Sequence, residues 1–261
     1  MTLYCPTDPQ PEPVNAPYML ECVVVCAGYT DFLRHTLPQN KALFDRLVVV
    51  TDWEDTPTRK LCEFYHVQCI PTDVLETRKG HFCKGKGINV GLAALSQTDW
   101  VLHLDADIWL PPQTRILLER MKLNKNGLYG VDRFNVTGAN KWNTFLTQPQ
   151  LQQENEGWVH LSNNTFPLGT RVIHKETGGY VPIGFFQLWN PSVSQIHTYP
   201  EGRTDAGAED FRFAMQWPRA DRHLLPEIVA YHLESEGATM GANWFGRKTS
   251  PFVIKGEGVL G

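Results

Sequence analysis

Short runs of almost wholly apolar residues recur along the first half of the chain, and they constrain its fold more than any other feature. The runs cover residues 19–28, 46–52, 67–70, 100–107 and 127–134. A strand that is apolar on both of its faces is typical of a parallel sheet covered by helices on each side. Helix-like segments separate the runs at the spacing of strand–helix–strand units. The sequence therefore predicts an α/β fold with a mostly parallel, doubly wound sheet.

The segments between these strands carry local helix signals. We expect helices over residues 30–43, 56–65, 86–96 and 111–123. Thr30 or Asp31 can cap the first helix, which Pro38 would kink or end. Pro57 stands at a favoured first position of the second helix.

The second half of the chain is less regular. Residues 180–190 and 225–233 are predicted strands, and residues 209–217 are a predicted helix. Residues 135–177 are rich in Asn, Gln, Thr and Gly, which predicts a long functional loop or a small subdomain over the sheet. Residues 1–17 hold five prolines and are expected to form a loose N-terminal arm. Because no linker divides the remainder, we expect one domain over residues 18–261.

Charge, hydropathy and cysteine usage narrow the class of protein. The formal charge of −4 disfavours a general nucleic-acid binder, because such proteins normally carry a basic surplus. No apolar run approaches the roughly 18 residues of a membrane-spanning helix. The N-terminus lacks the basic and apolar regions of a secretory signal. The six cysteines show no C-x-x-C spacing, so we expect reduced thiols and a cytoplasmic location.

Two carboxylates, Asp105 and Asp107, follow directly on the predicted strand over residues 100–107. Ligands of open α/β sheets bind outside the carboxyl ends of strands. Two neighbouring carboxylates repel each other unless a cation neutralises them. Hard ions such as Mg²⁺ and Mn²⁺ favour one or two carboxylates together with substrate phosphate oxygens. The pair therefore indicates a metal-bridged nucleoside diphosphate, and the alternative is a solvated turn at the strand end.

At this point the chain resembles the metal-dependent glycosyltransferases of the GT-A fold, especially glycosyltransferase family 2. The resemblance rests on five motifs in order: the opening strand Cys22–Tyr29; the stretch Lys86–Leu92, similar to the family's A-x-N-x-G; Asp105-Ala106-Asp107; Ala208-Glu209-Asp210, similar to the family's xED; and His232 at the end of the last strand. It covers about residues 20–248. It implies a single GT-A domain with a nucleotide-binding half over residues 18–134 and an acceptor-side half over residues 135–261.

The chain departs from the family pattern at two points. The second strand ends in Thr51-Asp52-Trp53-Glu54-Asp55 where the family commonly has D-D-G-S. This leaves open which acid reads the base of the nucleotide. The glycine loop that precedes the xED motif is supplied either by Gly178-Gly179 or by Gly184.

The resemblance implies that the chain binds Mn²⁺ or Mg²⁺. Asp107 would be the direct metal ligand, and Asp105 would hold the ribose or a metal-bound water. His232 would be the third protein contact to the ion, since imidazole suits Mn²⁺ better than Mg²⁺. The alternative for the two acids is that they cap the next helix, and for His232 that it is a core histidine bonded to backbone.

The same resemblance makes Asp210 the candidate general base of an inverting transfer. Its carboxylate would deprotonate an acceptor hydroxyl as that oxygen attacks the anomeric carbon opposite the leaving diphosphate. Glu209 would lie beside it and contact the acceptor or a backbone amide. The alternative is that Asp210 is a plain helix cap, because an acid in a first turn favours the helix dipole.

Several residues are expected to bind the nucleotide-sugar donor, with a UDP-sugar favoured. Ala27, Gly28 and Asp52 would line the nucleoside pocket, although a surface turn accounts equally well for Asp52. Asn89 lies in the A-x-N-x-G-like stretch. Basic residues near the predicted phosphate site are Lys84, Lys86, Arg247 and Lys248. Arg247 in the Gly-rich tail could close over the donor as a lid.

The acceptor is expected to bind against the second half of the sheet. Trp142, Trp158 and Trp244 are predicted to lie in loops, and aromatic faces stack on sugars and bases. A polar hydroxyl acceptor is expected: a glycan precursor, a small metabolite or a modified base in DNA, the last weakly disfavoured by net charge. Two other functions stay open, a sugar-1-phosphate nucleotidylyltransferase and a non-catalytic nucleotide-sugar-binding module. The Ala27-Gly28-Tyr29 loop has one glycine and no nearby lysine, which disfavours the nucleotidylyltransferase.

Overall fold

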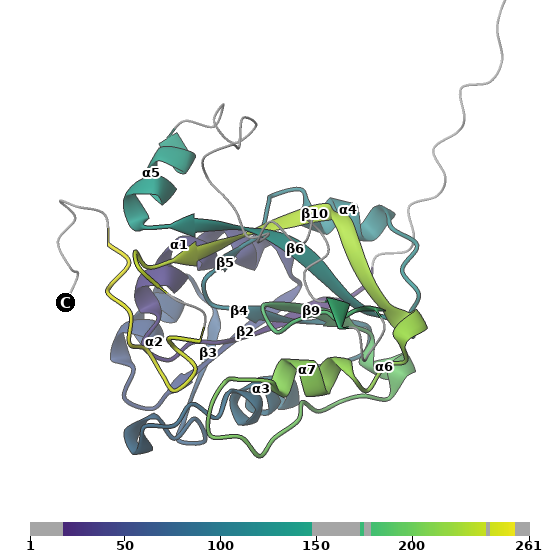
Figure 1. The fold of residues 1–261 in the computed structure, drawn as a ribbon, viewed down its shortest axis with the longest axis horizontal. Helices are drawn as coiled ribbons and strands as arrows, with labels where there is room; N and C mark the ends of the chain where they lie inside the picture. Colours follow the sequence, from purple (N-terminus) through teal and green to yellow (C-terminus); the bar gives the residue numbers. More distant parts are fainter. Residues whose placement is uncertain (1–17, 148–172, 175–178, 239–240, 254–261) are drawn as a thin grey trace, which may run out of the picture.

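The computed structural model describes residues 18–147, 173–174, 179–238 and 241–253 (Figure 1). The predicted arm over residues 1–17 lies outside this part of the chain, as does most of the segment 148–178. None of the helices in the described residues is long and apolar enough to cross a membrane.

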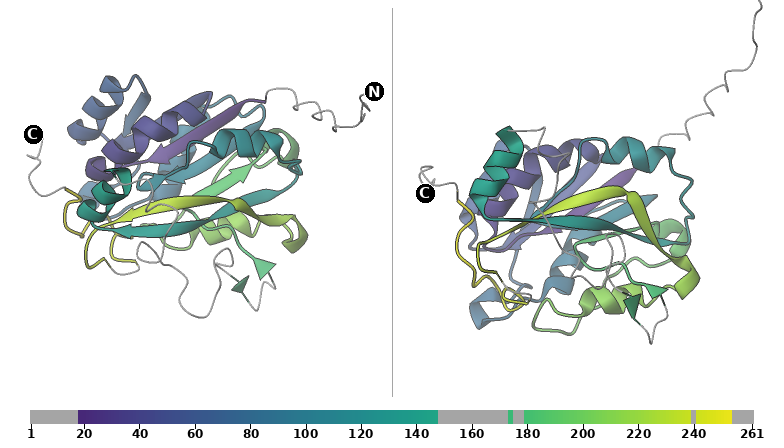
Figure 2. Two further views of the ribbon diagram at one scale, coloured as in Figure 1. Left: turned by 90° about the horizontal axis from the view of Figure 1, so that it is seen from above. Right: turned by 45° about the horizontal axis from the view of Figure 1, so that its top comes forward.

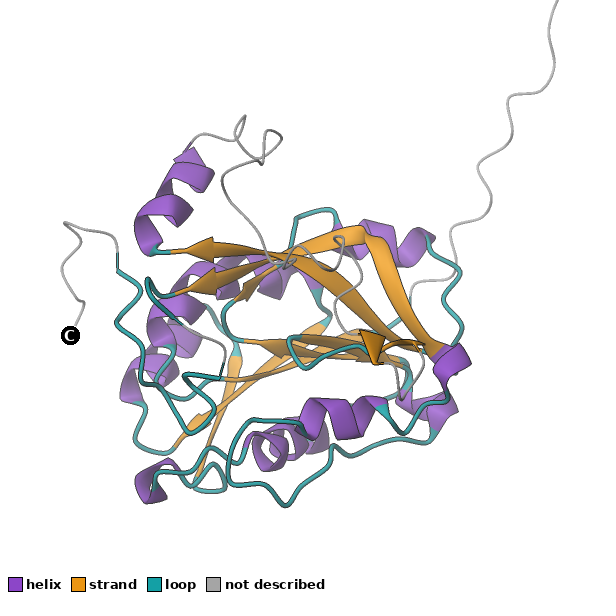
Figure 3. Cartoon of the chain, in the orientation of Figure 1, coloured by secondary structure: helices purple, strands orange, loops and turns teal. Residues whose placement is uncertain are grey.

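One sheet of eight strands forms the centre of the molecule (Figure 3). Its spatial order is β3-β2-β1-β4-β9-β6-β10-β5. The bounds are β1 Leu20–Val25, β2 Arg46–Asp52, β3 Gln68–Thr72, β4 Trp100–Asp105, β5 Ile108–Trp109, β6 Leu128–Thr137, β9 Phe186–Trp189 and β10 Arg222–Glu234. Neighbouring pairs among β1, β2, β3 and β4 are parallel, and so is the pair of β6 and β10. Strands β9 and β5 run antiparallel to their neighbours. The predicted, mostly parallel α/β sheet is confirmed.

Helices cover both faces of this sheet (Figure 2). The α-helices are α1 Thr30–Asn40, α2 Thr56–Phe64, α3 Lys84–Ala93, α4 Thr114–Arg120, α5 Ala139–Thr147, α6 Pro191–Ser194 and α7 Glu209–Ala214. Short 3-10 turns lie at Lys41–Leu43, Thr77–Lys79 and Arg219–Asp221, and a separate pair of strands is β7 Ile173–His174 and β8 Gly179–Tyr180.

The alternation of side chains along each strand divides the core between these faces. On β1, Cys22 and Val24 pack with residues of α1, α2 and α4, whereas Val23 and Val25 pack with residues of α3 and α7. Both sets of side chains are buried, which is why the run reads as apolar throughout. Gly91 allows α3 to lie close to the sheet, because a Cβ at this position would come within 2.1 Å of a Val23 methyl carbon. The glycine of the A-x-N-x-G-like stretch therefore has a packing role.

The second half of the chain differs from expectation at two places. Strand β6 continues to Thr137 and helix α5 follows at once, so the predicted irregular segment begins with regular structure. The predicted strand over residues 180–190 contributes only Phe186–Trp189 to the central sheet. Helix α1 continues through Pro38 to Asn40. All five cysteines among the described residues are free thiols, as expected, and Cys5 lies outside that part of the chain.

Candidate active site

A pocket of about 280 Å³ opens at the carboxyl ends of β1 and β4. It is lined by residues from distant parts of the sequence. Eight of them were singled out from the sequence: Ala27, Lys84, Asp105, Asp107, Gly184, Glu209, Asp210 and Trp244. The topology explains this gathering, since parallel strands end at one edge of the sheet and the segments that follow them meet there.

Asp105 is the last residue of β4 and is paired with the ammonium group of Lys84 at the start of α3. Its backbone N–H donates to the carbonyl of Phe185 at 3.1 Å, which fixes the strand end. Burial raises the pKa of Asp105, and the neighbouring Asp107 adds to the rise, although Lys84 opposes it. Burial lowers the pKa of Lys84, but the Asp105 carboxylate outweighs it and holds that pKa above its usual value. The pocket thus keeps an ammonium–carboxylate pair.

Asp107 faces His232 of β10. His232 Nε2 lies 3.4 Å from Asp107 Oδ2, and the backbone N–H of Leu233 donates to the Asp107 carbonyl at 2.9 Å. Burial alone would raise the pKa of Asp107, but the charges of His232, Arg133 and Lys84 outweigh it and lower the pKa. The other ring nitrogen of His232, Nδ1, is 2.9 Å from Asn135 Oδ1. A proton donated from Nδ1 to Asn135 would leave the Nε2 lone pair for a cation beside Asp107.

These side chains fit a divalent cation. Asp107 Oδ1 is buried and accepts no hydrogen bond from any residue in the described part of the chain. A buried carboxylate oxygen without a donor is costly unless something else neutralises it. Carboxylate oxygens together with one imidazole nitrogen suit Mn²⁺, and the oxygens alone suit Mg²⁺. Asp105, Asp107 and His232 are therefore the residues that would hold the ion.

Asp210 lies in the first turn of α7 and lines the same pocket. Its Oδ2 accepts the backbone N–H of Gly184 at 2.9 Å, and its Oδ1 accepts the N–H of Phe211 at 2.7 Å. A Cβ on Gly184 would come within 2.7 Å of the Asp210 Cβ, so only glycine allows this approach. Of the two glycine loops predicted to precede the xED motif, Gly184 contacts Asp210, whereas Gly178 of the other loop lies outside the described residues.

Glu209 has a different environment from its neighbour. Its side chain is buried, and Oε2 accepts the backbone N–H of Gly85 at 2.8 Å. Burial raises the pKa of Glu209, while the hydrogen bonds from Gly85 and Arg203 lower it. This carboxylate ties the first turn of α7 to the first turn of α3, which presents Lys84 to the pocket. Of the two roles expected for Glu209, the backbone amide contact is the one that the structure shows.

Six of the predicted donor-binding residues lie outside the pocket lining, and Asp52, Lys86 and Asn89 are three of them. Asp52 accepts hydrogen bonds from Thr77 Oγ1 and, at 3.0 Å, from the N–H of Glu54. Lys86 pairs with Glu76 at 2.8 Å. Asn89 Nδ2 donates to the carbonyl of Tyr199 at 2.9 Å, and its Oδ1 accepts the Tyr199 N–H at 2.6 Å. Asn89 therefore positions Tyr199, and it is Tyr199 that lines the pocket.

The C-terminal segment is anchored on α1 by Arg247. The guanidinium is ion-paired with Asp31 and lies over the rings of Tyr29 and Phe32, with its Cζ 5.0 and 4.7 Å from their centroids. It also donates to the carbonyl of Gly28 at 3.2 Å. Arg247 does not line the pocket; it fixes the segment whose other residues do.

The last two predicted donor-binding residues, Lys248 in the C-terminal segment and Gly28 after β1, have separate contacts. Lys248 is placed over the ring of Phe245, 5.7 Å from its centroid. Gly28 has a left-handed backbone with φ of 69° and donates its N–H to Asp55 Oδ2 at 2.9 Å. Neither residue is among those that line the pocket.

The three predicted acceptor-site tryptophans are in different places. Trp142 is on α5, is 0% exposed and packs against Trp109 and Phe145 in the core, so its predicted place in a loop is wrong. Its burial leaves no ring face for an acceptor. Trp158 lies outside the described residues. Trp244 lines the pocket and is 46% exposed, which is the surface expected of a stacking platform.

Sequence reasoning assigned no site role to six polar or aromatic residues that line the pocket: Tyr29, Phe82, Arg133, Phe185, Tyr199 and Asn243. Arg133 lies in β6, and its guanidinium is over the ring of Phe185 at 4.4 Å from the centroid. A cation near the end of an apolar strand was a signal for it. Tyr199 and Asn243 belong to irregular segments and carry no comparable signal.

Comparison with solved structures assigns the fold. The structure is similar to the mannosyltransferase PcManGT from Pyrobaculum calidifontis in complex with GDP-Man and Mn²⁺, with a TM-score of 0.50 and 15% identity over 86% of this chain. The chain has the GT-A fold. It covers 60% of the length of that mannosyltransferase. A second similar structure is glucosyl-3-phosphoglycerate synthase from Mycobacterium tuberculosis with Mg²⁺ and uridine-diphosphate, with a TM-score of 0.46 and 12% identity over 83% of this chain and 70% of that one.

Comparison of the sequence itself gives less. No protein-family model matches the chain, and no curated protein matches it. At these identities the likeness is one of fold, so the chemistry of the GT-A pocket has to be argued from its side chains.

Proposed function

We propose that this protein is a metal-dependent glycosyltransferase that uses a nucleotide-diphospho-sugar. The observation that carries the proposal is that one pocket holds both the Asp105–Asp107 pair and Asp210. The Asp105–Asp107 pair suits a cation and a diphosphate, and Asp210 offers a base on a separate element. A nucleotide-binding module would need the acid pair but not the base.

The cation-binding residues and the basic residues divide the work on the donor. When bound, Mn²⁺ or Mg²⁺ would stabilise the negative charge of the leaving diphosphate. Lys84 and Arg133, which both line the pocket, supply fixed positive charge in the same space. Ala27 and Tyr29, at the carboxyl end of β1, form the side of the pocket on which a nucleoside would rest.

Asp210 is the proposed general base. Its hydrogen bonds from Gly184 and Phe211 hold the carboxylate in one orientation. A carboxylate held in this way can accept the proton of an acceptor hydroxyl. Displacement of the diphosphate from the opposite face of the sugar then inverts the anomeric centre. Trp244, exposed at the pocket rim, is the proposed platform for a polar acceptor.

The finer assignments are proposals of the same kind. We favour a UDP-sugar as donor and a cytoplasmic hydroxyl acceptor, such as a glycan precursor or small metabolite. A modified DNA base is disfavoured by the net charge of −4. We also propose a donor-binding half over residues 18–134 and an acceptor-binding half over residues 135–261. The positions of Asp105 in the first half and Asp210 in the second support this division.

The test is release of UDP from a panel of UDP-sugars in the presence and absence of Mn²⁺. Asp107→Asn should abolish metal-dependent release, because an amide is a poor partner for a divalent cation. Asp210→Asn should keep donor affinity and lower turnover by a factor of about 10² to 10⁴. Asp73→Asn, at an exposed position, is the matched control and should behave as wild type.

The same assay separates the rival functions. Release of pyrophosphate from UTP and a sugar-1-phosphate would indicate a nucleotidylyltransferase. Binding of UDP-sugars without turnover, under every acceptor and metal condition, would indicate a non-catalytic module. Either result would contradict the proposed transferase.

A further inference from the structure

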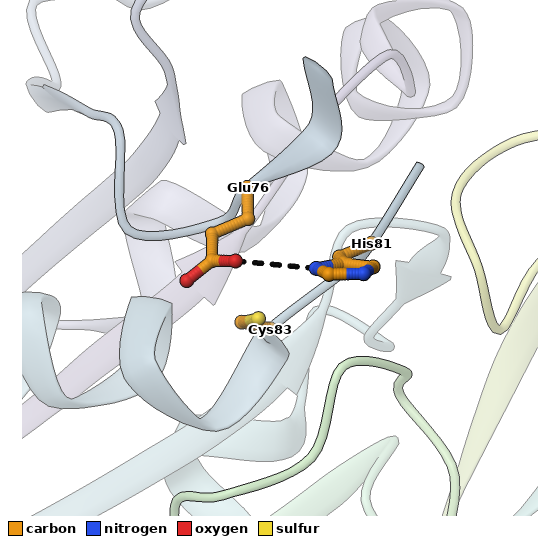
Figure 4. A group of neighbouring side chains, drawn as sticks. All are labelled: Glu76, His81 and Cys83. Carbon is orange, nitrogen blue, oxygen red and sulfur yellow. Dashed lines mark hydrogen bonds and ion pairs between the residues drawn. The ribbon is translucent and has the colours of Figure 1, made fainter. Parts of the chain in front are cut away.

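Three side chains of different ligand type meet outside the pocket, in the connection between β3 and α3. Glu76, His81 and Cys83 bring a carboxylate oxygen, an imidazole nitrogen and a sulfur within 4.8 Å of one another (Figure 4). Glu76 Oε2 is 3.1 Å from His81 Nδ1. Figure 4 shows the Glu76 carboxylate facing the His81 ring, with the Cys83 sulfur near both.

The backbone folds tightly to make this meeting. Glu76 and Gly80 have left-handed conformations, with φ of 57° and 73°, on either side of the 3-10 turn Thr77–Lys79. The N–H of His81 donates to the carbonyl of Glu76 at 3.3 Å, and the N–H of Cys83 donates to the carbonyl of Leu75 at 3.0 Å. A left-handed conformation is unfavourable for a residue with a Cβ, so strain at Glu76 is maintained by its surroundings. The result is that side chains at positions i, i+5 and i+7 share one space.

We propose that Glu76, His81 and Cys83 form a Zn²⁺ site, separate from the cation site at Asp107. Zinc binds thiolate, imidazole and carboxylate ligands in a tetrahedron, with bonds of about 2.0 to 2.3 Å. Such bonds place ligand atoms about 3.5 Å apart, so the three groups need only small side-chain movements. The His81 side chain is 35% exposed, so water can reach the site and supply a fourth ligand.

Zn²⁺ would bind Glu76 Oε2 and His81 Nδ1, with the ring proton of the neutral imidazole on Nε2, and the Cys83 thiol would release its proton to solvent. Burial and the charge of Glu76 raise the pKa of the Cys83 thiol, but a bound Zn²⁺ stabilises the thiolate. Binding should therefore weaken as the pH falls.

Two lysines also contact the Glu76 carboxylate and must be accommodated. Lys86 donates to Oε1 at 2.8 Å, which leaves Oε2 for the ion. Lys79 donates to Oε2 at 3.3 Å, but its side chain is 67% exposed and can turn into water. One carboxylate can therefore serve Lys86 and Zn²⁺ together.

The position of the site suggests what the ion does there. Phe82 and Lys84 flank Cys83 in the sequence, and both line the donor pocket. Zinc at Cys83 would fix the loop that presents them. This role rests on the proposed transferase function, whereas binding of the ion does not.

The test uses the purified full chain carrying Asp107→Asn, stripped with a chelator and titrated with Co²⁺ as a spectroscopic substitute for Zn²⁺. The substitution removes the other proposed cation site. We expect one equivalent of Co²⁺ with a thiolate-to-cobalt charge-transfer band, displaced by one equivalent of Zn²⁺. Cys83→Ser should remove the band. His81→Ala should weaken Zn²⁺ affinity more than about 100-fold, beyond the cost of losing an outer-shell partner.

The controls are Cys69→Ser and His197→Ala, a thiol and an imidazole elsewhere in the chain, which should leave the titration unchanged. Cys69 is a strict control because its sulfur is hydrogen-bonded to that of Cys62. These two thiols form a pair that could also bind a metal. A band that persists in Cys83→Ser, or that disappears in Cys69→Ser, overturns the proposal. So does a wild-type chain that binds no Co²⁺ with sulfur ligation. Because the readout needs no sugar donor, it stands even if no UDP-sugar is turned over.

Discussion

Replacing Lys84 by methionine tests whether its ammonium group neutralises the acid pair of the pocket when no metal ion is bound. Lys84 is paired with Asp105, and the two side chains are 15% and 28% exposed. Removing one partner of a fully buried pair costs about 3–5 kcal/mol, whereas an exposed pair is worth about 0–1 kcal/mol. This pair lies between those limits, so Lys84→Met should lower the free energy of unfolding at pH 7 by about 2–3 kcal/mol. For a chain of about this size, that lowers Tm by about 4–12 °C.

The loss should depend on pH in a direction that the structure sets. Burial already raises the pKa of Asp105, and removing the ammonium group raises it further. An acid with a raised pKa in the folded state destabilises the fold above that pKa and ceases to do so below its unfolded pKa of about 3.9. The difference in Tm between wild type and Lys84→Met should therefore shrink as the pH falls from 7 towards 4.

The cation provides the second arm of the test, by differential scanning fluorimetry with and without Mn²⁺. A ligand at 100 times its Kd stabilises the fold by about 2.7 kcal/mol. Without Lys84 the ion meets no competing ammonium group, so Mn²⁺ should raise the Tm of Lys84→Met more than that of wild type. Lys60→Met, at an exposed position on α2, is the control. Equal Tm values for wild type and Lys84→Met, with equal Mn²⁺ shifts, would refute the reasoning.

Three further changes have defined outcomes. Gly184→Ala should lower turnover by about 10² with donor affinity retained, because its Cβ would come within 2.7 Å of the Asp210 Cβ and displace the proposed base; steady-state kinetics would check this. Trp142→Ala should lower the free energy of unfolding by about 3–5 kcal/mol in denaturant titrations, as expected of a core residue, and a loss under 1 kcal/mol would contradict its burial. The pKa of Glu76 is lowered to about 2 by hydrogen bonds from Lys86, His81 and Lys79, so its contribution to stability is complete above the unfolded pKa and lost as the pH falls towards 2. In Glu76→Gln, measured with a chelator present, unfolding free energy should therefore fall less steeply over that pH range than in wild type.

The first half of the fold follows from local pattern, whereas the second depends on long-range pairing. Strands β1, β2 and β4 are apolar on both faces and are followed by helices, so their parallel direction could be predicted. Strand β9 is only Phe186–Trp189, and it inserts between β4 and β6 in the antiparallel sense. Nothing within four residues specifies that place, since register there is set by partners that are distant in the sequence.

The sequence of helix α5 has apolar residues at helical spacing, but the polar residues between them obscured this pattern. Its buried residues Ala139, Trp142 and Phe145 recur every three positions, as one face of a helix requires. Asn and Thr between them made the segment read as a polar loop, because these residues are poor helix formers. Burial of the apolar face supplies the stability that propensity lacks.

The two lysines at the start of α3 show why the sequence could place a basic group near the pocket without choosing it. Lys84 and Lys86 are two residues apart, and successive residues of an α-helix turn by about 100°, so their side chains leave opposite sides of the helix. Glu209 helps to fix which side faces Asp105, because it accepts the N–H of Gly85, where the Pro200 carbonyl and the Glu209 carboxylate leave no room for a Cβ. Lys84 is thus directed to Asp105 and Lys86 to Glu76. Among the lysines of the described residues, Lys84 therefore shares the pocket with the acid pair, and Glu209, 124 residues after Gly85, helps to direct it there.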